Sequence, residues 1–225
     1  MQKTSVISLG GSVLVPDNVD VEFLREFRAL ILKLVKKGNR FIIICGGGKV
    51  CRDYQDAARA VSKVSDNDLD WIGVHATRFN AQLLHSVFGK EAHKEVVKDP
   101  SLDTEFKEAI VIAAGWKPGW STDFVATLLA KNHKVDSIIN ITSKPYVYDS
   151  DPAKNKSARP IRDIAWNDFR KMFGSKWSPG LSSPFDPVAS KECHDSGIKV
   201  VIMGRNLKNM ENFFEGKKFE GTVIK

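Results

Sequence analysis

Two glycine clusters in the first fifty residues each follow a short apolar segment. Gly10-Gly11-Ser12 comes directly after residues 5–9, and Gly46-Gly47-Gly48-Lys49 comes directly after residues 41–45. Apolar segments that end in glycine are typical of the buried strands of a parallel sheet. Glycine at this point lets backbone N–H groups approach a ligand, and a following helix presents its positive N-terminal end. The pattern predicts two phosphate-binding turns at one edge of a sheet.

Glycine after a strand is also ordinary turn chemistry, so the clusters alone do not define a class of protein. Neither cluster matches the G-x-x-x-x-G-K-[ST] or the G-x-G-x-x-G pattern of common nucleotide-binding proteins. The second apolar segment ends in Cys45, where a dinucleotide-binding dehydrogenase would place an acidic residue. A dehydrogenase of that type is therefore disfavoured.

The composition favours one domain that binds small anions. The 225 residues are 42% hydrophobic and 27% charged, which suits a single core and predicts one domain over residues 1–225. The formal charge of +7 is scattered along the chain, so we expect no nucleic-acid partner.

No apolar stretch reaches the ~20 residues of a membrane span and no signal-peptide pattern is present, so we expect a cytoplasmic protein without a membrane partner. The three cysteines lack metal-binding spacing, and we expect no metal site of the protein's own.

Strand and helix patterns alternate along the chain. This order predicts an α/β fold with parallel strands and both glycine turns at one edge. We expect helices at 21–37, 49–62, 66–88, 124–131 and 184–196, strands at 5–9, 41–45, 96–97, 108–114, 136–141, 146–148, 198–203 and 221–224, and a solvated loop at 149–159.

The order and spacing of several short motifs are more specific than any one of them. Together the motifs resemble the amino-acid kinase superfamily and, within it, the archaeal-type branch of uridylate (UMP) kinases. The motifs are Leu9-Gly10-Gly11-Ser12-Val13-Leu14-Val15-Pro16, Gly46-Gly47-Gly48-Lys49 with Arg52, Ile72-Gly73, Thr77-Arg78-Phe79-Asn80-Ala81, Pro118-Gly119, Thr122-Asp123, Tyr148 with Asp151-Pro152, and Asp186-Pro187-Val188-Ala189.

The resemblance implies a three-layer αβα sandwich around a mainly parallel central sheet. It also implies a nucleoside monophosphate kinase of pyrimidine biosynthesis that transfers the γ-phosphoryl group of ATP to UMP, with Mg²⁺ carried by ATP and a homohexameric assembly. Such a reaction requires positioning and charge neutralisation rather than a covalent intermediate. Two alternatives are a nucleotide-binding sensor on the same fold and a kinase of another phosphate or carboxylate acceptor. Isopentenyl phosphate kinases place a histidine shortly after the first glycine turn, and this chain has none there.

The resemblance also implies site residues. Gly10 and Gly11 would donate backbone hydrogen bonds to the migrating phosphoryl group, and Asp70 would hold the ribose of UMP, with Asp68 as a rival and Asp66 as an alternative helix cap. The expected ATP-binding residues are Ser8, Leu9, Gly10, Gly11, Ser12, Gly48, Arg52, Thr142, Ser143, Tyr148 and Asp151. The expected UMP-binding residues are Gly47, Asp70, Trp116, Lys117, Pro118, Gly119, Trp120, Ser121 and Thr122.

Several of these residues have an alternative role. Arg52 also suits a solvated helix surface, and Thr122-Asp123 also suits a helix cap. Trp116 and Trp120 replace smaller or polar family residues, and they would stack on the pyrimidine or shield the site from water.

The chain departs from the family pattern at two places. Ser8 stands where much of the superfamily has a lysine that neutralises the transferred phosphoryl group, so Lys49 and Lys191 become the candidate catalytic cations. Residues 143–148 read Ser-Lys-Pro-Tyr-Val-Tyr, where the family commonly has Asn-Val-Asp-Gly-Val-Tyr. The second departure leaves the preferred phosphoryl donor open.

Overall fold

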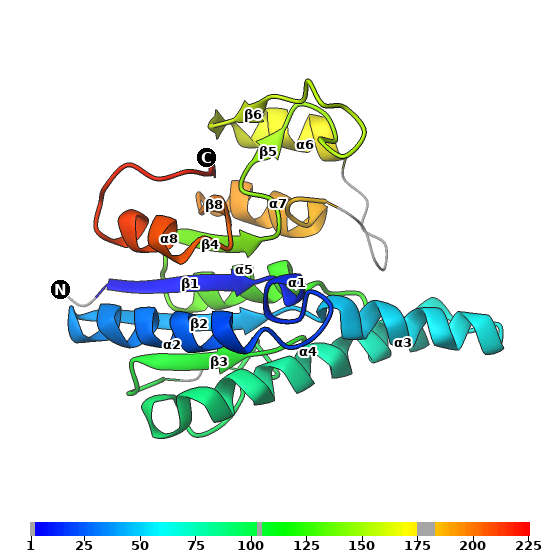
Figure 1. Ribbon diagram of the computed structural model, residues 1–225, viewed down its shortest axis with the longest axis horizontal. Coiled ribbons are helices and arrows are strands. Elements are labelled where there is room, and N and C mark those ends of the chain that lie inside the picture. Colours follow the sequence, from blue (N-terminus) through cyan, green and yellow to red (C-terminus); the bar gives the residue numbers. More distant parts are fainter. Residues whose placement is uncertain (1–2, 103–104, 175–182) are drawn as a thin grey trace.

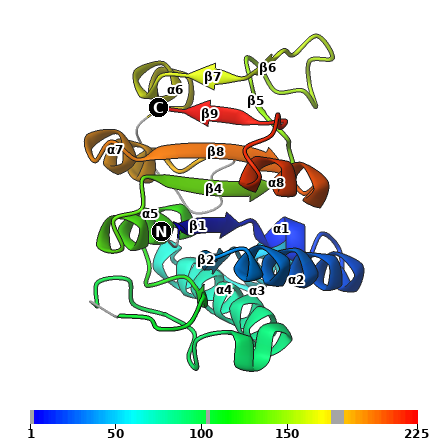
Figure 2. The ribbon, with the colours of Figure 1, turned by 90° about the vertical axis from the view of Figure 1, so that its left-hand side faces the viewer.

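The computed structural model describes residues 3–102, 105–174 and 183–225, and over these residues its centre is a seven-stranded sheet (Figures 1 and 2). In spatial order the strands are β3 (Ile110–Ala113), β2 (Asn39–Cys45), β1 (Lys3–Leu9), β4 (Ser137–Thr142), β8 (Lys199–Gly204), β9 (Thr222–Ile224) and β7 (Asp163–Ile164). Neighbouring strands are parallel except β8 and β9. The predicted mainly parallel sheet is confirmed.

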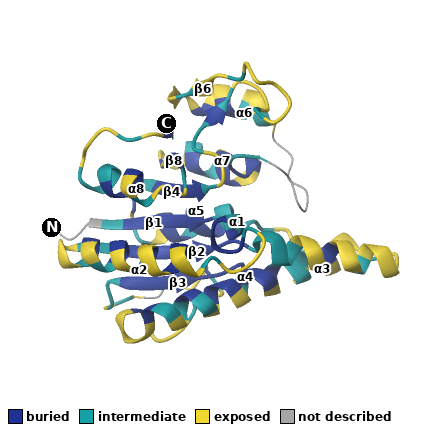
Figure 3. Ribbon diagram, in the orientation of Figure 1, coloured by how far each residue is buried: buried dark blue, intermediate teal, exposed yellow. Residues whose placement is uncertain are grey.

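Successive residues of the central strands contribute to opposite faces of the sheet, as the two-residue period of a strand requires. In β1, Ile7 and Leu9 pack into one core, whereas Val6 packs into the other. The first core is covered by α2 (Val21–Lys36), α4 (Asp66–Phe88) and α8 (Leu207–Phe214). The second is covered by α5 (Thr122–Asn132), α6 (Trp166–Phe173) and α7 (Pro187–Asp195). Buried strands therefore lie between two helical layers, which confirms the αβα sandwich (Figure 3).

One helix pair extends past the carboxyl ends of β1 and β2. It consists of α3 (Gly48–Val61) and α4, and the far end of the pair is exposed (Figures 1 and 3). The side-chain amide of Gln55 on α3 donates to the Leu69 carbonyl on α4 at 2.8 Å and is buried between them. This pair forms one wall beside the glycine turns, because α3 begins at Gly48 itself.

The structure adds two helices that the patterns did not predict, α6 and α8. It also adds α1 (Gly11–Leu14), the 3-10 turn Gly89–Glu91, and the short strands β6 (Pro160–Ile161) and β7, whereas the strand predicted at 146–148 is observed as β5 (Val147–Tyr148). The strand predicted at 96–97 is reduced to one bridge, between Val97 and Ala113. The helix predicted from residue 184 begins at Pro187, and the helix predicted from residue 124 begins at Thr122. None of the helices in the described part of the chain is long and apolar enough to cross a membrane.

Candidate active site

The two glycine turns touch each other through their backbones. Strands β1 and β2 are parallel neighbours, so their carboxyl ends lie at the same edge of the sheet. A Cβ atom on Gly11 would lie 2.0 Å from the backbone nitrogen of Gly48, and Gly48 itself has a φ of +66°. Only residues without a Cβ allow this approach and this backbone conformation. The prediction of two glycine turns at one edge of a parallel sheet is confirmed.

The backbone N–H groups of these turns are not equally free. The N–H of Gly10 donates to the Ile141 carbonyl at 2.9 Å, and the N–H of Gly46 donates to the Leu9 carbonyl at 2.9 Å. This corrects the expectation that Gly10 donates to a phosphoryl group. The N–H groups of Gly11 and Ser12 begin α1, where helix geometry provides no carbonyl partner, so they are the donors left for a ligand.

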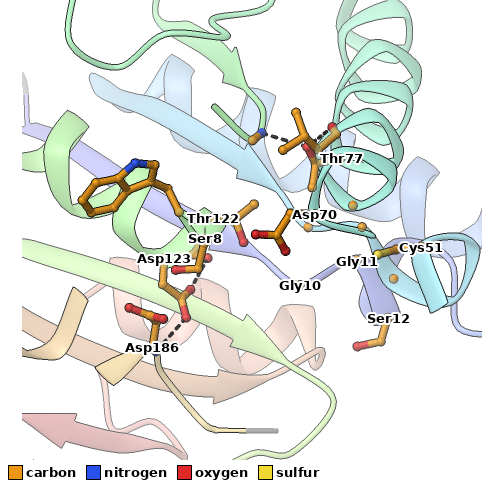
Figure 4. A pocket seen from close by; sticks show the side chains of 18 of the residues that line it. Ser8, Gly10, Gly11, Ser12, Cys51, Asp70, Thr77, Thr122, Asp123 and Asp186 are labelled. Carbon is orange, nitrogen blue, oxygen red and sulfur yellow. Dashed lines mark hydrogen bonds between the residues drawn. The ribbon is translucent and has the colours of Figure 1, made fainter. Parts of the chain in front are cut away.

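A cavity of about 380 Å³ opens above the two turns (Figure 4). It brings together most of the residues that were predicted to bind the nucleotides. Those that line it are Ser8, Gly10, Gly11, Ser12, Gly47, Gly48, Arg52, Asp70, Lys117, Trp120, Ser121, Thr122 and Thr142.

A second cavity of about 560 Å³ adjoins the first, and the two share Thr142, Ser183 and Pro184 in their walls. The predicted residues Ser143, Tyr148 and Asp151 line this second cavity. Its apolar wall consists of Met172, Phe173 and Ile202, with the rings of Tyr146 and Tyr148 packed edge to face. One wall is therefore aromatic and apolar, and it adjoins the polar glycine-turn cavity.

Some predicted residues line neither cavity. Leu9 is buried in the core below the sheet edge. Trp116, Pro118 and Gly119 lie in the loop that borders the first cavity, but they do not line it.

The two lysines that were predicted to replace the missing cation are also outside the cavities. Lys49 pairs with Asp53 at 2.7 Å, and Lys191 pairs with Asp195, each one helical turn further along its own helix. Both therefore serve as surface ion pairs in this structure.

The geometry distinguishes Asp70 from its rivals on α4. Asp70 lines the cavity, and its carboxylate accepts a hydrogen bond from the Gly119 N–H at 2.8 Å. Asp68 instead accepts from the Ser65 hydroxyl at 2.7 Å, and Ser65 caps the helix where Asp66 was the alternative. Burial raises the pKa of Asp70. Among Asp66, Asp68 and Asp70, Asp70 is the one that lines the cavity.

A carboxylate pair, Asp123 and Asp186, lies at the floor of the cavity (Figure 4). Asp123 accepts hydrogen bonds from the Ser8 hydroxyl at 2.9 Å and from the Asp186 backbone N–H at 3.0 Å. Asp186 is only 6% exposed, caps α7 through one oxygen, and leaves Oδ2 buried with no hydrogen-bond partner in the described residues. Burial, with the charge of Asp186 as a second cause, raises the pKa of Asp123 to about 7. Burial also raises the pKa of Asp186. Among the described residues no cationic side chain pairs with either carboxylate, so a positive charge brought to this point of the cavity would be stabilised.

Polar side chains of α4 position the loops around the cavity. Asn80 is buried, and its amide donates to the carbonyls of Gly46 at 2.8 Å and Gly47 at 3.1 Å. The Thr77 hydroxyl accepts from the Gly115 N–H at 2.8 Å, and Arg78 donates to the Trp116 carbonyl at 2.7 Å. The Thr77-Arg78-Phe79-Asn80-Ala81 motif therefore connects the second glycine turn to the 115–120 loop.

Aromatic rings order the loop that faces α4. The ring of Trp120 lines the cavity and stacks on Phe124, with ring centroids 4.1 Å apart. Trp116 lies 6.1 Å from Trp120, and the Lys117 ammonium lies 3.9 Å above the Trp116 ring. Ser121, directly after this loop, caps α5 by accepting from the Phe124 N–H at 3.1 Å. Because Ser121 is the cap, the Asp123 carboxylate remains available to the cavity.

Comparison with known proteins identifies the family of this site. The amino acid kinase family profile matches residues 3–204. The chain belongs to the amino acid kinase family. It is 36% identical to the uridylate kinase of Thermoplasma volcanium, over all of this chain and 98% of that protein. It is 34% identical to the uridylate kinase of Thermococcus sibiricus, over 97% of this chain and 98% of that protein.

Solved structures of this family share the fold over nearly the whole chain. The crystal structure of uridylate kinase from Archaeoglobus fulgidus superposes with a TM-score of 0.82 at 32% identity, covering 99% of this chain and all of that one. The UMP kinase from Bacillus anthracis superposes with a TM-score of 0.79 at 22% identity, over 99% of this chain and 95% of that one, and so supports the fold alone. The first cavity therefore opens above the glycine turns of an amino acid kinase fold.

The motifs of the amino acid kinase family contained the carboxylate pair, but the sequence did not show its role. Asp123 was interpreted as part of a helix cap, and Asp186 only as part of a motif. The two lie 63 residues apart, and no spacing rule predicts their contact. A weak signal was present only at Asp123, which directly precedes the helix predicted at 124–131, whereas Asp186 lies inside the helix predicted at 184–196.

Proposed function

We propose that this protein is a UMP kinase that transfers the γ-phosphoryl group of ATP to UMP and releases UDP and ADP. The main support is the pair of adjoining cavities, which offers room for two nucleotides, the first cavity being lined by the two touching glycine turns. Full-length similarity to uridylate kinases supports the same acceptor. Phosphoryl transfer between two nucleotides needs both ligands in line at one polar site.

ATP would place its base in the second cavity and its phosphates along the first glycine turn. Tyr148 and the apolar wall suit a purine ring, and Thr142 lies where the two cavities meet. The Gly11 and Ser12 N–H groups would donate to the transferred phosphoryl group. Arg52 lines the same cavity and forms no ion pair within the described residues, so its guanidinium would contact the phosphates.

UMP would occupy the opposite side of the first cavity. Asp70 would accept hydrogen bonds from the ribose hydroxyls, and the backbone of Gly47 would approach the acceptor phosphate. Trp120 offers its ring to the pyrimidine, and Lys117 adds a positive charge to this wall.

The residues around the cavity floor suit the Mg²⁺ that accompanies ATP. Asp186 Oδ2 lacks a partner within the described residues, and Asp123 lies next to it, so the two carboxylates would hold the cation. Mg²⁺ is commonly bound by one or two carboxylates together with phosphate oxygens and water. When bound, it would neutralise charge on the phosphates during transfer. Ser8, by donating to Asp123, would fix the orientation of that carboxylate.

Four further features of this function are predictions from the resemblance and the composition. They are a role in pyrimidine nucleotide biosynthesis, a homohexameric assembly, a cytoplasmic location, and a single amino-acid kinase domain over residues 1–225. The side chain of Phe79 on α4 is 73% exposed and gives one apolar contact for such an assembly.

A coupled assay of ADP release tests the function. The wild-type protein is incubated with ATP, Mg²⁺ and each nucleoside monophosphate in turn, and we expect the highest kcat/KM with UMP. Asp186→Asn is the inactive control, because it removes a charge from the proposed cation site. Binding of ATP and UMP without ADP release would favour a nucleotide sensor. Turnover with another phosphate or a carboxylate, and none with UMP, would identify a different acceptor.

A further inference from the structure

We propose that Lys144 is a donor-binding residue whose ammonium group contacts the phosphates of the bound nucleoside triphosphate. This inference rests on the proposed function and extends it to a residue that the family pattern does not contain. The family commonly has valine at the position of Lys144, in the Asn-Val-Asp-Gly-Val-Tyr segment that this chain replaces.

The cations that line the two cavities within the described residues are few. Arg52 and Lys117 line the first cavity, and Lys144 lines the second. Lys49 and Lys191 are held in helical ion pairs outside both cavities, and position 8 is a serine. Lys144 is therefore the one cation among the described residues that line the second cavity, whereas Arg52 lines the first.

Lys144 offsets the negative charge of the residues that line the second cavity. The described residues that line this cavity include two acids, Asp149 and Asp151, and one cation, Lys144. Without Lys144 the described walls of this cavity would carry only carboxylates, which would disfavour an anionic nucleotide whose phosphates lie just beyond it. A lysine here makes the donor cavity compatible with an anionic ligand.

The backbone of Lys144 is fixed where the two cavities meet. The Thr142 hydroxyl donates to the Lys144 carbonyl at 2.8 Å and accepts from the Lys144 N–H at 3.1 Å. Thr142 lines both cavities, so the stem of Lys144 starts beside the passage between base and phosphates. Pro145, which follows, fixes its own φ and packs against Gly204 at the end of β8. Because the backbone is held in place, the ammonium group can reach a ligand only by rotation of the flexible four-carbon side chain of Lys144.

The present partner of Lys144 is easily exchanged. Its ammonium lies 3.1 Å from the Asp151 carboxylate, and the two side chains are 52% and 42% exposed. Ion pairs this exposed contribute little stability. Asp151 also accepts from the Ala153 N–H at 3.1 Å, so it keeps a hydrogen bond when the lysine turns away. A phosphate group, with more charge and more acceptor oxygens, would compete well for the ammonium.

The test compares the binding of ADP and of adenosine, which share the base and ribose but differ in phosphate. Calorimetry is done on the wild type, Lys144→Ala, Lys144→Arg and the control Lys171→Ala, which removes an exposed lysine of α6 that pairs with Asp168 and lines neither cavity. We expect Lys144→Ala to weaken ADP binding about ten- to hundredfold, as loss of one charge-assisted contact predicts. Adenosine binding and the KM for UMP should stay within about twofold, the scatter of surface substitutions. Lys144→Arg should recover most of the ADP affinity, and Lys171→Ala should match the wild type.

Three outcomes would overturn the inference. Unchanged ADP affinity in Lys144→Ala would show that the ammonium makes no phosphate contact. A parallel loss of ADP and adenosine binding would show that Lys144 only holds the 142–151 segment in place. An equal loss in Lys171→Ala would point to general destabilisation of this part of the molecule. Wild-type protein that binds ADP but does not phosphorylate UMP would refute the proposed function alone, whereas wild-type protein that binds no ADP would refute both.

Discussion

Replacement of Gly11 by alanine tests whether the contact between the two glycine turns is what holds the site together. The added Cβ would lie 2.0 Å from the Gly48 nitrogen and 2.6 Å from the carbonyl carbon and oxygen of Gly46. Non-bonded atoms of this kind normally stay about 3.5 Å apart, so one turn must move by roughly 1.5 Å. All three opposing atoms belong to the backbone, and no rotamer change can relieve the overlap.

The size of the effect follows from that displacement. Overpacking of a filled site costs about 1–3 kcal/mol, and a backbone clash belongs at the upper end of this range. For a chain of this length, a loss of about 3 kcal/mol lowers the Tm by roughly 6–12 °C. A shift of about 1 Å in the reacting groups lowers the rate about a hundredfold, so kcat/KM should fall by at least this factor. Thermal unfolding and the ADP-release assay measure the two effects.

Gly73→Ala is the matched control, because Gly73 lines the same cavity. Its Cβ would lie 3.5 Å from Cys51 Sγ and from Gln55 Nε2, which are ordinary contacts. Gly73 lies within α4, where alanine stabilises a helix by up to about 1 kcal/mol relative to glycine. The Tm should therefore rise slightly in this variant. If Gly11→Ala kept the wild-type Tm and kcat/KM, the contact between the turns would not be essential and the reasoning would be wrong.

Three further predictions concern binding and stability. Arg52→Ala should lower kcat/KM for ATP about ten- to hundredfold through a lost charge-assisted contact, with little change in Tm; equal activity would remove Arg52 from the site. Asp70→Asn should raise the KM for UMP about tenfold and that for ATP much less, as one lost hydrogen bond to a charged group predicts, and equal effects on both would contradict the ribose assignment. Hydrogen bonds from Lys208 and Lys33 lower the pKa of Glu211 to about 2, from 4.5. A lowered folded-state pKa stabilises the protein above the unfolded value, so this contribution should be lost as the pH falls from about 4.5 toward 2. Urea unfolding at pH 7, 4 and 3 should show a smaller acid-induced loss for Glu211→Gln, and an identical loss would exclude the cluster as a cause.

Sequence periodicity predicted the part of the fold that positions the glycine turns. The strands that end at Leu9 and Cys45 are buried on both faces, so apolar residues predominate in each, although Ser5 and Ser8 interrupt the first, and glycine marks the end of both. The helix predicted at 21–37 is observed at Val21–Lys36, because its apolar residues repeat at the helical period. In such segments local pattern and tertiary burial agree.

The missed helices are short, and their apolar residues are few. In α8, Leu207, Met210 and Phe213 are spaced three residues apart behind the cap Asn206, which accepts from the Asn209 N–H at 3.0 Å. In α6, the corresponding signal is only Trp166, Phe169 and Phe173. Helices of eight residues are marginal without tertiary packing, so their sequence signal is weak by nature.

The sequence predicted the site residues that belong to a single motif. It did not predict the roles that depend on contacts between distant parts of the chain. Lys49 and Lys191 were chosen for their positions beside motifs, yet each has an aspartate four residues later, at Asp53 and Asp195. That spacing is itself a sequence signal for a surface ion pair. Applied to the sequence, it would have favoured a structural role for both lysines.

The serine at position 8 changes how charge is distributed over the whole site. Ser8 is 3% exposed and offers Asp123 a neutral hydrogen bond, where much of the superfamily has a lysine. Among the described residues no cationic side chain pairs with Asp123 or Asp186, and burial opposes the ionisation of both carboxylates. Their negative charge is best balanced by a cation that enters with the ligand, because such a charge is present only when the phosphates are present. In the function we propose, Arg52, Lys144 and a cation that enters with the substrate would supply the positive charge that a lysine at position 8 would carry. We therefore expect the binding of nucleotide with its cation to balance the charge of these carboxylates and to stabilise this part of the fold.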